Sequence, residues 1–243
     1  FTFISMKIAI LGYGKMGKAI ERIALERGHT ICLKVNSANL DELTTENLSK
    51  ADVAIEFSTP DNVLANINLS LKAGTPIAIG TTGWYNKQDE VYKKVEAVNG
   101  CLLAASNFSV GVNIFFELNR KLAQLMKNQP NYTAEIQEIH HTEKLDSPSG
   151  TAITLAEDLI QSSSIYTHWQ NSANENKDSL EIKSFREPEV PGTHEINYDS
   201  DIDSIRIIHE AKNRNGFALG AVLAAEYIHN KKGIFTMQDV LKN

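Results

Sequence analysis

A glycine-rich turn near the start of the chain restricts the possible folds more than any other stretch. Lys7-Ile8-Ala9-Ile10-Leu11 is an apolar run of strand length, and Gly12-Tyr13-Gly14-Lys15-Met16-Gly17 follows it directly. Apolar residues then recur at helical spacing as far as Gly28, a common helix stop. A strand, a Gly-x-Gly-x-x-Gly turn and a helix in this order favour a dinucleotide site. The alternative is a glycine-rich strand-to-helix turn that binds no ligand.

Strand and helix patterns alternate through the first hundred residues. The further runs that read as strands are 30–35, 52–57, 76–79 and 101–104. This alternation predicts an α/β domain with a doubly wound, Rossmann-like parallel sheet that binds ligands at the carboxyl ends of its strands. Gly80-Thr81-Thr82 and Ala105-Ser106-Asn107-Phe108 lie at two of these ends. They would serve as ordinary turns in any fold, but their common edge favours contact with a cofactor.

The residues after the second strand bear on the choice of coenzyme. An acid at this point binds the ribose 2′-hydroxyl of NAD. This strand instead ends in Val35-Asn36-Ser37, and no acid comes before Asp41. Asn36 is neutral and would not repel a 2′-phosphate, and Lys34 would help to attract it. We therefore expect NADPH to be accepted at least as readily as NADH.

The pattern changes from Ser109 onward. A long apolar helical pattern is followed by strand-like runs with little helix between them, at 132–138, 180–185, 194–198 and 204–212. This indicates an α+β domain with an open, mostly antiparallel sheet and a helix from Thr151 packed on it. The segment 162–179 reads as a surface loop or an oligomer contact.

The end of the chain reads as part of the first domain. Its apolar helical pattern, 217–228, and a last short helix, 237–241, would cover the nucleotide-binding sheet. We expect a discontinuous dinucleotide-binding domain, 6–108 with 214–243. Residues 109–213 would form the substrate-binding and tetramerisation domain.

One polar stretch gathers groups that can do chemistry. Glu138-Ile139-His140-His141-Thr142-Glu143-Lys144-Leu145-Asp146-Ser147-Pro148-Ser149-Gly150-Thr151-Ala152 lies between a predicted strand and a predicted helix. Ser147 or Ser149 can cap that helix, and Pro148 suits its first turn. The amides there would hold a carboxylate or phosphate at the positive helix end. Each residue alone has an ordinary structural explanation, whereas the whole group favours function.

Composition restricts the partners. The 243 residues carry a formal charge of −6 and no block of basic residues, which argues against nucleic acid as the main partner. No apolar run approaches the roughly 20 residues that span a bilayer. Cys32 and Cys101 both lie in apolar runs, so we expect buried free thiols, which fit a reducing cytoplasm.

Taken together, the motifs resemble the 4-hydroxy-tetrahydrodipicolinate (dihydrodipicolinate) reductase family. The similarity covers essentially residues 6–243, and its most specific part is the Glu-x-His-His-x-x-Lys-x-Asp-x-Pro-Ser-Gly-Thr-Ala string from Glu138 to Ala152. The resemblance implies an NADPH- or NADH-dependent reductase of a cyclic, unsaturated dicarboxylate in the diaminopimelate route to lysine. It also implies a cytoplasmic homotetramer joined through the sheets of the substrate domains, and no metal.

The resemblance also implies roles for individual residues. His140 would donate or accept a proton, Lys144 would donate one, and the substrate would contact His141, Ser149, Gly150 and Thr151. The expected cofactor contacts are Gly12, Tyr13, Gly14, Lys15, Met16, Gly17, Asn36, Gly80, Thr81, Thr82, Ala105, Ser106, Asn107, Phe108, Arg214 and Phe217. Two positions depart from the family pattern: Asn36, where NADH-preferring members carry an acid, and the Arg186-Glu187-Pro188 turn, where glycine usually follows the arginine.

Two other functions fit parts of the sequence. One is a Rossmann oxidoreductase for another substrate, which would use a reactive cysteine or a tyrosine-lysine pair; neither has a suitable place here. The other is a redox-sensing regulator that binds NAD(H), but no basic recognition helix is visible.

Overall fold

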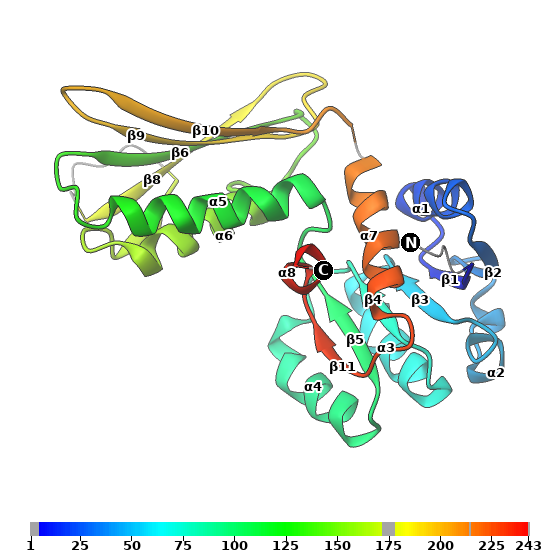
Figure 1. Cartoon of the computed structure of the whole chain (residues 1–243). Coiled ribbons are helices and arrows are strands. Elements are labelled where there is room, and N and C mark those ends of the chain that lie inside the picture. The colour runs from blue at the N-terminus through cyan, green and yellow to red at the C-terminus, as the bar shows by residue number, and fades with distance from the viewer. Residues whose placement is uncertain (1–4, 172–177, 214, 243) are drawn as a thin grey trace. The chain divides into compact units, whose positions relative to one another are not determined.

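The computed structural model describes residues 5–171, 178–213 and 215–242. The chain forms two compact units, Phe1–Val110 with Asn215–Asn243 and Gly111–Arg214 (Figure 1). The first unit holds a parallel sheet covered by helices, and the second holds a separate sheet with two long helices. The predicted fold class, a Rossmann-like domain with an additional α+β domain, is confirmed.

All strand pairs in the sheet of the first unit are parallel. The strands lie in the order β11-β5-β4-β3-β1-β2. Their bounds are β1 Lys7–Leu11, β2 Thr30–Val35, β3 Val53–Glu56, β4 Ile77–Ile79, β5 Cys101–Ala104 and β11 Gly233–Phe235. Because β2 and β3 lie on opposite sides of β1, the strand order reverses there, which is where open α/β sheets bind ligands. The three-residue strand β11 was not predicted.

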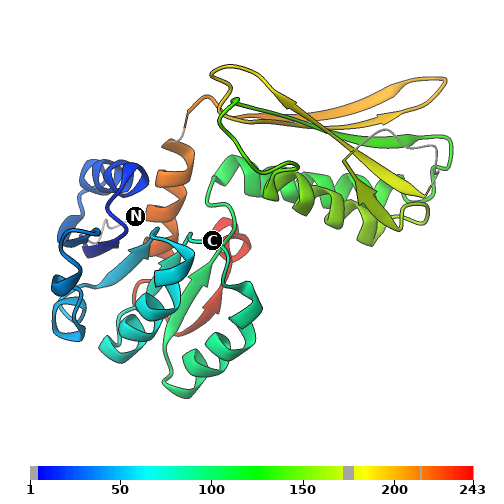
Figure 2. The same cartoon turned by 180° about the vertical axis from the view of Figure 1, so that it is seen from behind.

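Helices cover both faces of this sheet (Figures 1 and 2). One face packs on α1 Lys15–Glu26, α7 Asn215–Ile228 and α8 Met237–Leu241, and the other on α2 Thr45–Leu48, α3 Pro60–Ala73 and α4 Gln88–Ala97. Alternate residues of β1 serve the two cores, since Ile8 and Ile10 enter the first and Ala9 and Leu11 the second. Burial on both faces explains why these strands read as continuous apolar runs.

The sheet of the second unit is mixed, in the order β10-β9-β6-β8-β7. Its elements are α5 Val110–Met126, β6 Thr133–His140, α6 Gly150–Ser162, β7 His168–Gln170, β8 Ser179–Arg186, β9 Thr193–Asp199 and β10 Ser204–Glu210. Two pairings, β6 with β8 and β7 with β8, are parallel, and two are antiparallel. The expected mostly antiparallel sheet is therefore wrong in this detail. The reason is α6, which acts as a crossover and returns the chain parallel to β6.

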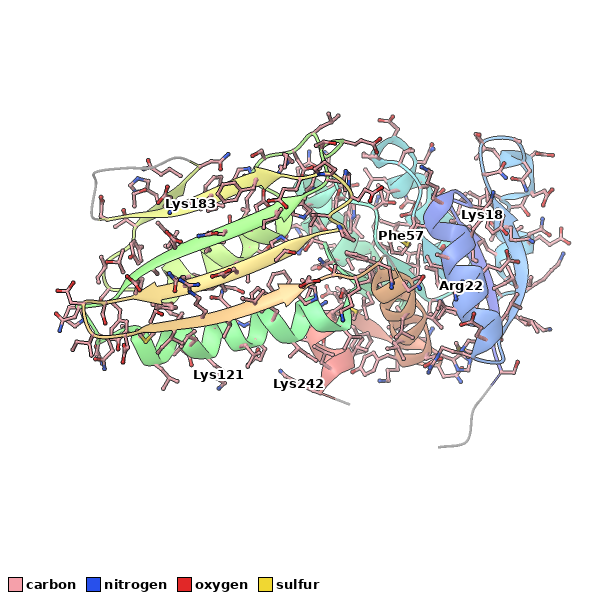
Figure 3. The ribbon with its side chains drawn as sticks, turned by 90° about the horizontal axis from the view of Figure 1, so that it is seen from above. Lys18, Arg22, Phe57, Lys121, Lys183 and Lys242 are labelled. Carbon is pink, nitrogen blue, oxygen red and sulfur yellow. The ribbon has the colours of Figure 1, made fainter. Side chains whose placement is uncertain are left out.

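One face of this second sheet packs on α5 and α6, and the opposite face carries polar and charged residues. Ile136, Ile182 and Ile196 enter the core with the helices. Strand alternation turns their neighbours to the other face. Figure 3 shows that face, with Lys183 upon it.

Three local expectations require correction. His140 is the last residue of β6 and not part of the connection, since the strand continues past Glu138. The segment 162–179 includes β7, a short strand at the sheet edge; residues 172–177 of that segment lie outside the described residues. Cys32 is exposed because β2 is an edge strand, whereas Cys101 is buried. Within the described residues, no helix has both the length and the apolar character needed to cross a membrane.

Candidate active site

The three glycines of the turn after β1 differ in the space around them. Gly12 has a φ of +98°, and a Cβ there would lie 2.1 Å from the carbonyl oxygen of Phe57. A Cβ at Gly17 would lie 2.6 Å from the carbonyl oxygen of Gly12. At Gly14, no atom of another part of the described chain lies within 4 Å of the corresponding position. Gly12 and Gly17 are thus needed for packing within the turn, while Gly14 leaves its own side open.

A cleft of about 620 Å³ lies beside this turn. It is lined by Gly12, Tyr13 and Gly14 and by Asn36 after β2, four of the predicted cofactor residues. It is also lined by residues that the sequence did not single out, namely Leu40, Leu43, Phe57, Ser58, Thr59, Asn62, Ala65, Asn66 and Leu69. The sequence could have indicated the residues that follow β3, because β3 pairs with β1 in the sheet and its carboxyl end therefore lies beside the glycine turn.

A buried carboxylate shapes the wall of this cleft. Glu56, the last residue of β3, is fully buried. It accepts hydrogen bonds from the Ser58 amide and from Nδ2 of Asn66, both at 3.1 Å, and from the Ser58 hydroxyl. The acid therefore fixes the two cleft residues and does not itself line the space.

The Phe57 ring, labelled in Figure 3, connects two other predicted cofactor segments. A Cβ at Gly80 would lie 2.2 Å from this ring, and the Phe108 ring centroid is 5.5 Å away. Phe108 packs in the hydrophobic core, and the Thr81 side chain is buried as well. The exposed members of the two segments are Thr82 and Ser106.

The remaining predicted cofactor residues do not line the cleft, within the described part of the chain. Lys15, Met16 and Gly17 open α1, and Gly80, Ala105 and Asn107 follow β4 and β5. Asn107 uses its Oδ1 to accept from the Ser109 amide at 2.9 Å. Phe217 is half-buried in α7. Arg214 lies outside the described residues.

Lys34 is already engaged by an acid. Its Nζ lies 3.2 Å from Oε1 of Glu21 and 5.1 Å from the centroid of the Tyr13 ring, and the Tyr13 hydroxyl donates to the same Glu21 carboxylate. Lys34 is also not among the cleft residues. Its expected attraction for a 2′-phosphate is therefore offset by Glu21.

In the second unit, the end of β6 brings a carboxylate and two imidazoles together. Glu138 is fully buried, and its Oε2 lies 3.4 Å from Nδ1 of His140 and 3.7 Å from Nε2 of His194 on β9. The two rings meet edge to face with their centroids 5.0 Å apart. Both side chains are buried as well. The sequence did not predict that Glu138 and His194 would join His140.

The loop after β6 is held by an arginine from β8. Arg186 donates from Nη2 to the carbonyl of Asp146 at 2.6 Å and from Nε to the carbonyl of Lys144 at 3.4 Å. Lys144 in turn donates to both carboxylate oxygens of Asp146, at 2.7 and 2.8 Å. The predicted proton donor is therefore anchored beside the end of β6 by Asp146 and Arg186.

Ser149 caps the following helix, which settles the choice between Ser147 and Ser149. Its Oγ accepts from the Ala152 amide at 3.2 Å, and its own amide donates to both oxygens of Glu138 at 3.1 Å. Pro148 precedes the cap and lies outside the first turn. The helix begins at Gly150, where a Cβ would meet no atom of the residues that the structure describes within 4 Å. Its positive end is thus open on the side of Gly150.

The histidines of this region differ in their electrostatic environment. Burial lowers the pKa of His140, although the negative charge of Glu138 opposes that shift, and Lys144 and Arg186 lower the pKa further. Burial also lowers the pKa of His194, to about 3, with smaller contributions from its neighbours His140 and His209. His194 is therefore neutral at physiological pH. His141 is half-buried, and its Nδ1 has no partner within the described residues.

A metal ion is not the best explanation for this cluster. Glu138, His140 and His194 place their donor atoms within 4.8 Å of one another. However, the Glu138 carboxylate already accepts the Ser149 amide, and Nη1 of Arg186 lies 3.6 Å from its Oε1. A cation there would compete with the guanidinium, so a hydrogen-bonded cluster fits these residues better.

Comparisons with known proteins agree across the whole chain. Residues 6–108 match the family described as "Dihydrodipicolinate reductase, N-terminus", and residues 111–241 match "Dihydrodipicolinate reductase, C-terminus". A curated 4-hydroxy-tetrahydrodipicolinate reductase of Christiangramia forsetii is 49% identical over 98% of both chains. One of Rickettsia rickettsii is 37% identical over 94% of this chain and 95% of its own length.

A solved structure shares the fold. It is a dipicolinate-bound dihydrodipicolinate reductase from Paenisporosarcina sp. TG-14, with a TM-score of 0.78 and 24% identity, covering 97% of this chain and 99% of that one. At this identity the likeness supports the fold, while the two family matches and the 49% identical relative show the relationship. The chain belongs to the dihydrodipicolinate reductase family.

Proposed function

We propose that this protein reduces 4-hydroxy-tetrahydrodipicolinate to tetrahydrodipicolinate with NAD(P)H, in the diaminopimelate route to lysine. As a member of a reductase family it is an oxidoreductase. The observation that carries the substrate assignment is the 49% identity to a curated reductase of this substrate over nearly the whole chain. A cytoplasmic location suits such a biosynthetic enzyme.

The first unit provides the features that a dinucleotide needs. The open side of Gly14, the adjacent cleft and Asn36 at its edge fit a pyrophosphate and a ribose. We therefore assign cofactor binding to the first unit and substrate binding to the second. The bound coenzyme supplies the hydride.

The second unit provides the acid-base groups. Reduction of a conjugated imine places negative charge on the ring, which the Lys144 ammonium can stabilise and which a nearby acid can quench. We assign proton donation to Lys144 and proton donation or acceptance to His140. The anchoring of Lys144 by Asp146 and of its loop by Arg186 supports this assignment.

The start of α6 suits a carboxylate of the substrate. Its open Gly150 end presents a positive helix terminus, to which Thr151 and His141 are adjacent in sequence. Ser149 is almost fully buried, and its hydroxyl contacts both the Ala152 amide and Nε2 of His194. It supports the helix start, and its direct contact with substrate stays a prediction.

Substrate-dependent loss of NADPH absorbance is the expected result when the protein meets the freshly formed condensation product of pyruvate and aspartate semialdehyde. With NADH run in parallel, we expect kcat/KM for NADPH to be at least as high, because Asn36 presents no negative charge to a 2′-phosphate. A hundredfold preference for NADH would contradict the coenzyme assignment. Binding of both coenzymes without turnover would contradict the substrate assignment.

Two matched variants test whether the residue at position 36 sets the coenzyme preference. Asn36→Glu should shift the ratio of the two kcat/KM values toward NADH by about tenfold or more, because a carboxylate binds the ribose 2′-hydroxyl and repels a phosphate. Thr45→Glu introduces the same charge at an exposed residue of α2, outside the cleft, and should leave the ratio unchanged.

We propose further that the open face of the second sheet joins four copies of the chain. The strand register places Ile139 beside Phe185, which is 45% exposed, and Ile208 on the same face is 57% exposed. Around them lie acids and bases, among them Lys183 paired with Glu135 at 2.7 Å. Exposed apolar residues surrounded by charged residues are typical of a protein–protein interface.

Sedimentation tests this assembly. The protein should sediment as a tetramer, and Phe185→Arg should shift it to smaller species by placing a charge in the apolar part of the face, with NADPH binding retained. Leu125→Arg replaces a more exposed residue, 74%, on α5 and should leave the tetramer intact. A monomeric wild type, or a tetramer that survives Phe185→Arg, would count against the proposed interface.

A further inference from the structure

Glu138 is a fully buried acid that lies beside His140, the residue to which we have assigned proton transfer. Its neighbours leave it tightly enclosed: the Ser149 amide bonds both oxygens at 3.1 Å, and Nη1 of Arg186 is 3.6 Å from Oε1. Oε2 lies 3.4 Å from Nδ1 of His140. A buried carboxylate carries a large desolvation cost unless hydrogen bonds or nearby charges offset it.

The orientation of the His140 ring is fixed from more than one side. Its Nδ1 edge points toward Glu138, while Nε2 and Cδ2 lie beside Gly192, where a Cβ would come within 3.1 and 3.2 Å of them. Gly192 has a φ of +152°. The His194 ring packs edge to face against the same imidazole. The two ring nitrogens therefore face different surroundings, a carboxylate on one side and a glycine backbone on the other.

We propose that Glu138 is a positioning residue for His140: its carboxylate holds the proton on Nδ1, so that Nε2 is the nitrogen that exchanges a proton during turnover. This inference rests on the proposed role of His140 in catalysis. Nδ1 is buried and has no aligned hydrogen-bond partner within the described residues, and Oε2 of Glu138 lies 3.4 Å from it. Catalytic hydrogen bonds are commonly long before substrate binds, and a small ring rotation would close this one.

His194 does not compete for this role. Its Nε2 lies 3.2 Å from the Ser149 hydroxyl, and burial lowers its pKa to about 3. The Ser149 oxygen accepts from the Ala152 amide, which leaves its own proton to donate to that nitrogen. His194 thus remains neutral and linked to Ser149, and the Glu138 charge acts mainly on His140.

The charges around His140 predict how the loss of Glu138 would act. The groups that face the ring are Glu138 on its own strand, Arg186 on β8, His194 on β9, and Lys144 and Asp146 on the loop. Glu138 and Asp146 raise the pKa of His140, while burial, Lys144 and Arg186 lower it. Removing the charge of Glu138 therefore lowers the pKa of His140 and frees the proton to move to Nε2.

The test compares Glu138→Gln with the wild type by ring ¹⁵N NMR of the histidines, assigned through His140→Gln. Glutamine keeps an oxygen for the Ser149 amide but removes the charge. The wild type should show His140 with its proton on Nδ1, and the variant should show a larger fraction on Nε2 and a titration displaced to lower pH. These readouts need neither coenzyme nor substrate, and a merely structural role for Glu138 would not move them.

Kinetics give the second readout. For Glu138→Gln we expect kcat to fall about tenfold to a hundredfold. This loss is smaller than the roughly 10²–10⁴-fold contribution of general acid-base catalysis, because the variant keeps His140 and loses only its positioning. KM for the substrate should change less than about twofold, because in this proposal Glu138 contacts His140 and not the substrate. The limb of the pH profile governed by His140 should move to lower pH. Glu157→Gln makes the same substitution on the exposed side of α6 and should alter none of these quantities.

The outcomes separate this inference from the assignment of His140. Full activity in His140→Gln would remove the catalytic role of His140 and the inference with it. Loss of activity in His140→Gln, together with an unchanged tautomer and pH profile in Glu138→Gln, would overturn the inference alone. If Glu138→Gln does not fold, Glu138→Asp keeps the charge but withdraws it from the ring. That variant should weaken the Nδ1-protonated signal and lower kcat, and wild-type values for both would overturn the proposal.

Discussion

Lys144→Ala is expected to lower kcat by about a thousandfold while the dissociation constant for NADPH stays within about twofold of wild type. A thousandfold loss corresponds to about 4 kcal/mol of transition-state stabilisation, within the range of a lost general acid. Lys144 lies in the second unit, far in sequence from the residues of the coenzyme cleft. Stopped-flow reduction and fluorescence titration of NADPH would measure the two quantities.

The fold should survive this substitution. Lys144 is half-buried, but its partner Asp146 is exposed to solvent, and ion pairs that are open to solvent contribute about 0–1 kcal/mol. Arg186 would still hold the loop through its backbone carbonyls. Lys121→Ala on α5 provides the control for loss of a lysine in the same unit. Parallel losses of turnover, coenzyme affinity and melting temperature in Lys144→Ala would make Lys144 a folding residue instead.

Gly14→Val should abolish measurable binding of both coenzymes, a loss of about a hundredfold or more, with little change in melting temperature. The position lies at the edge of the cleft, and an added Cβ meets no protein atom within 4 Å. A branched side chain would therefore occupy the space of the pyrophosphate without disturbing the turn. Isothermal titration with NADPH and with NADH measures the effect.

The neighbouring Gly12→Ala variant should show the opposite pattern. Its Cβ would lie 2.1 Å from the carbonyl oxygen of Phe57, and its φ of +98° strains any side chain. We expect it to destabilise the first unit by more than about 2 kcal/mol, seen as a clear fall in melting temperature. Wild-type affinity in Gly14→Val would show that the pyrophosphate binds elsewhere, whatever Gly12→Ala does.

Local patterns predicted most of the first unit. The apolar run of β1, the glycine turn and α1 are consecutive, so their order alone indicated the fold and the position of Gly14. The same reasoning missed β11, because three residues give too little pattern and the strand pairs with β5, more than a hundred positions away. It also missed the cleft residues after β3, whose place depends on strand order in the sheet.

In the second unit, too, contacts between distant strands could not be predicted from the sequence. His140 was predicted to lie in a loop because polar residues interrupt the alternation of β6, yet it is a buried strand residue. Arg186 meets the loop of Lys144 only because α6 makes β8 parallel to β6 and places His140 opposite Arg186. Spacing in the sequence carries no information about such pairs. The motif therefore indicated the chemistry, while its supporting residues came from tertiary structure.

The late position of α7 and β11 in the chain has a consequence for protein synthesis. Both belong to the first unit, although the whole second unit lies between them and β5. A chain still on the ribosome, complete only to about residue 214, has every strand of the first sheet except β11, but only α1 of the three helices that cover one of its faces, since α7 and α8 are still missing. The part of that apolar face left uncovered by α7 and α8, and the unpaired edge of β5, are then open to wrong contacts. The first unit is thus the first to be translated but the last to have all its elements. We expect its dependence on chaperones to be greatest during translation of residues 111–214.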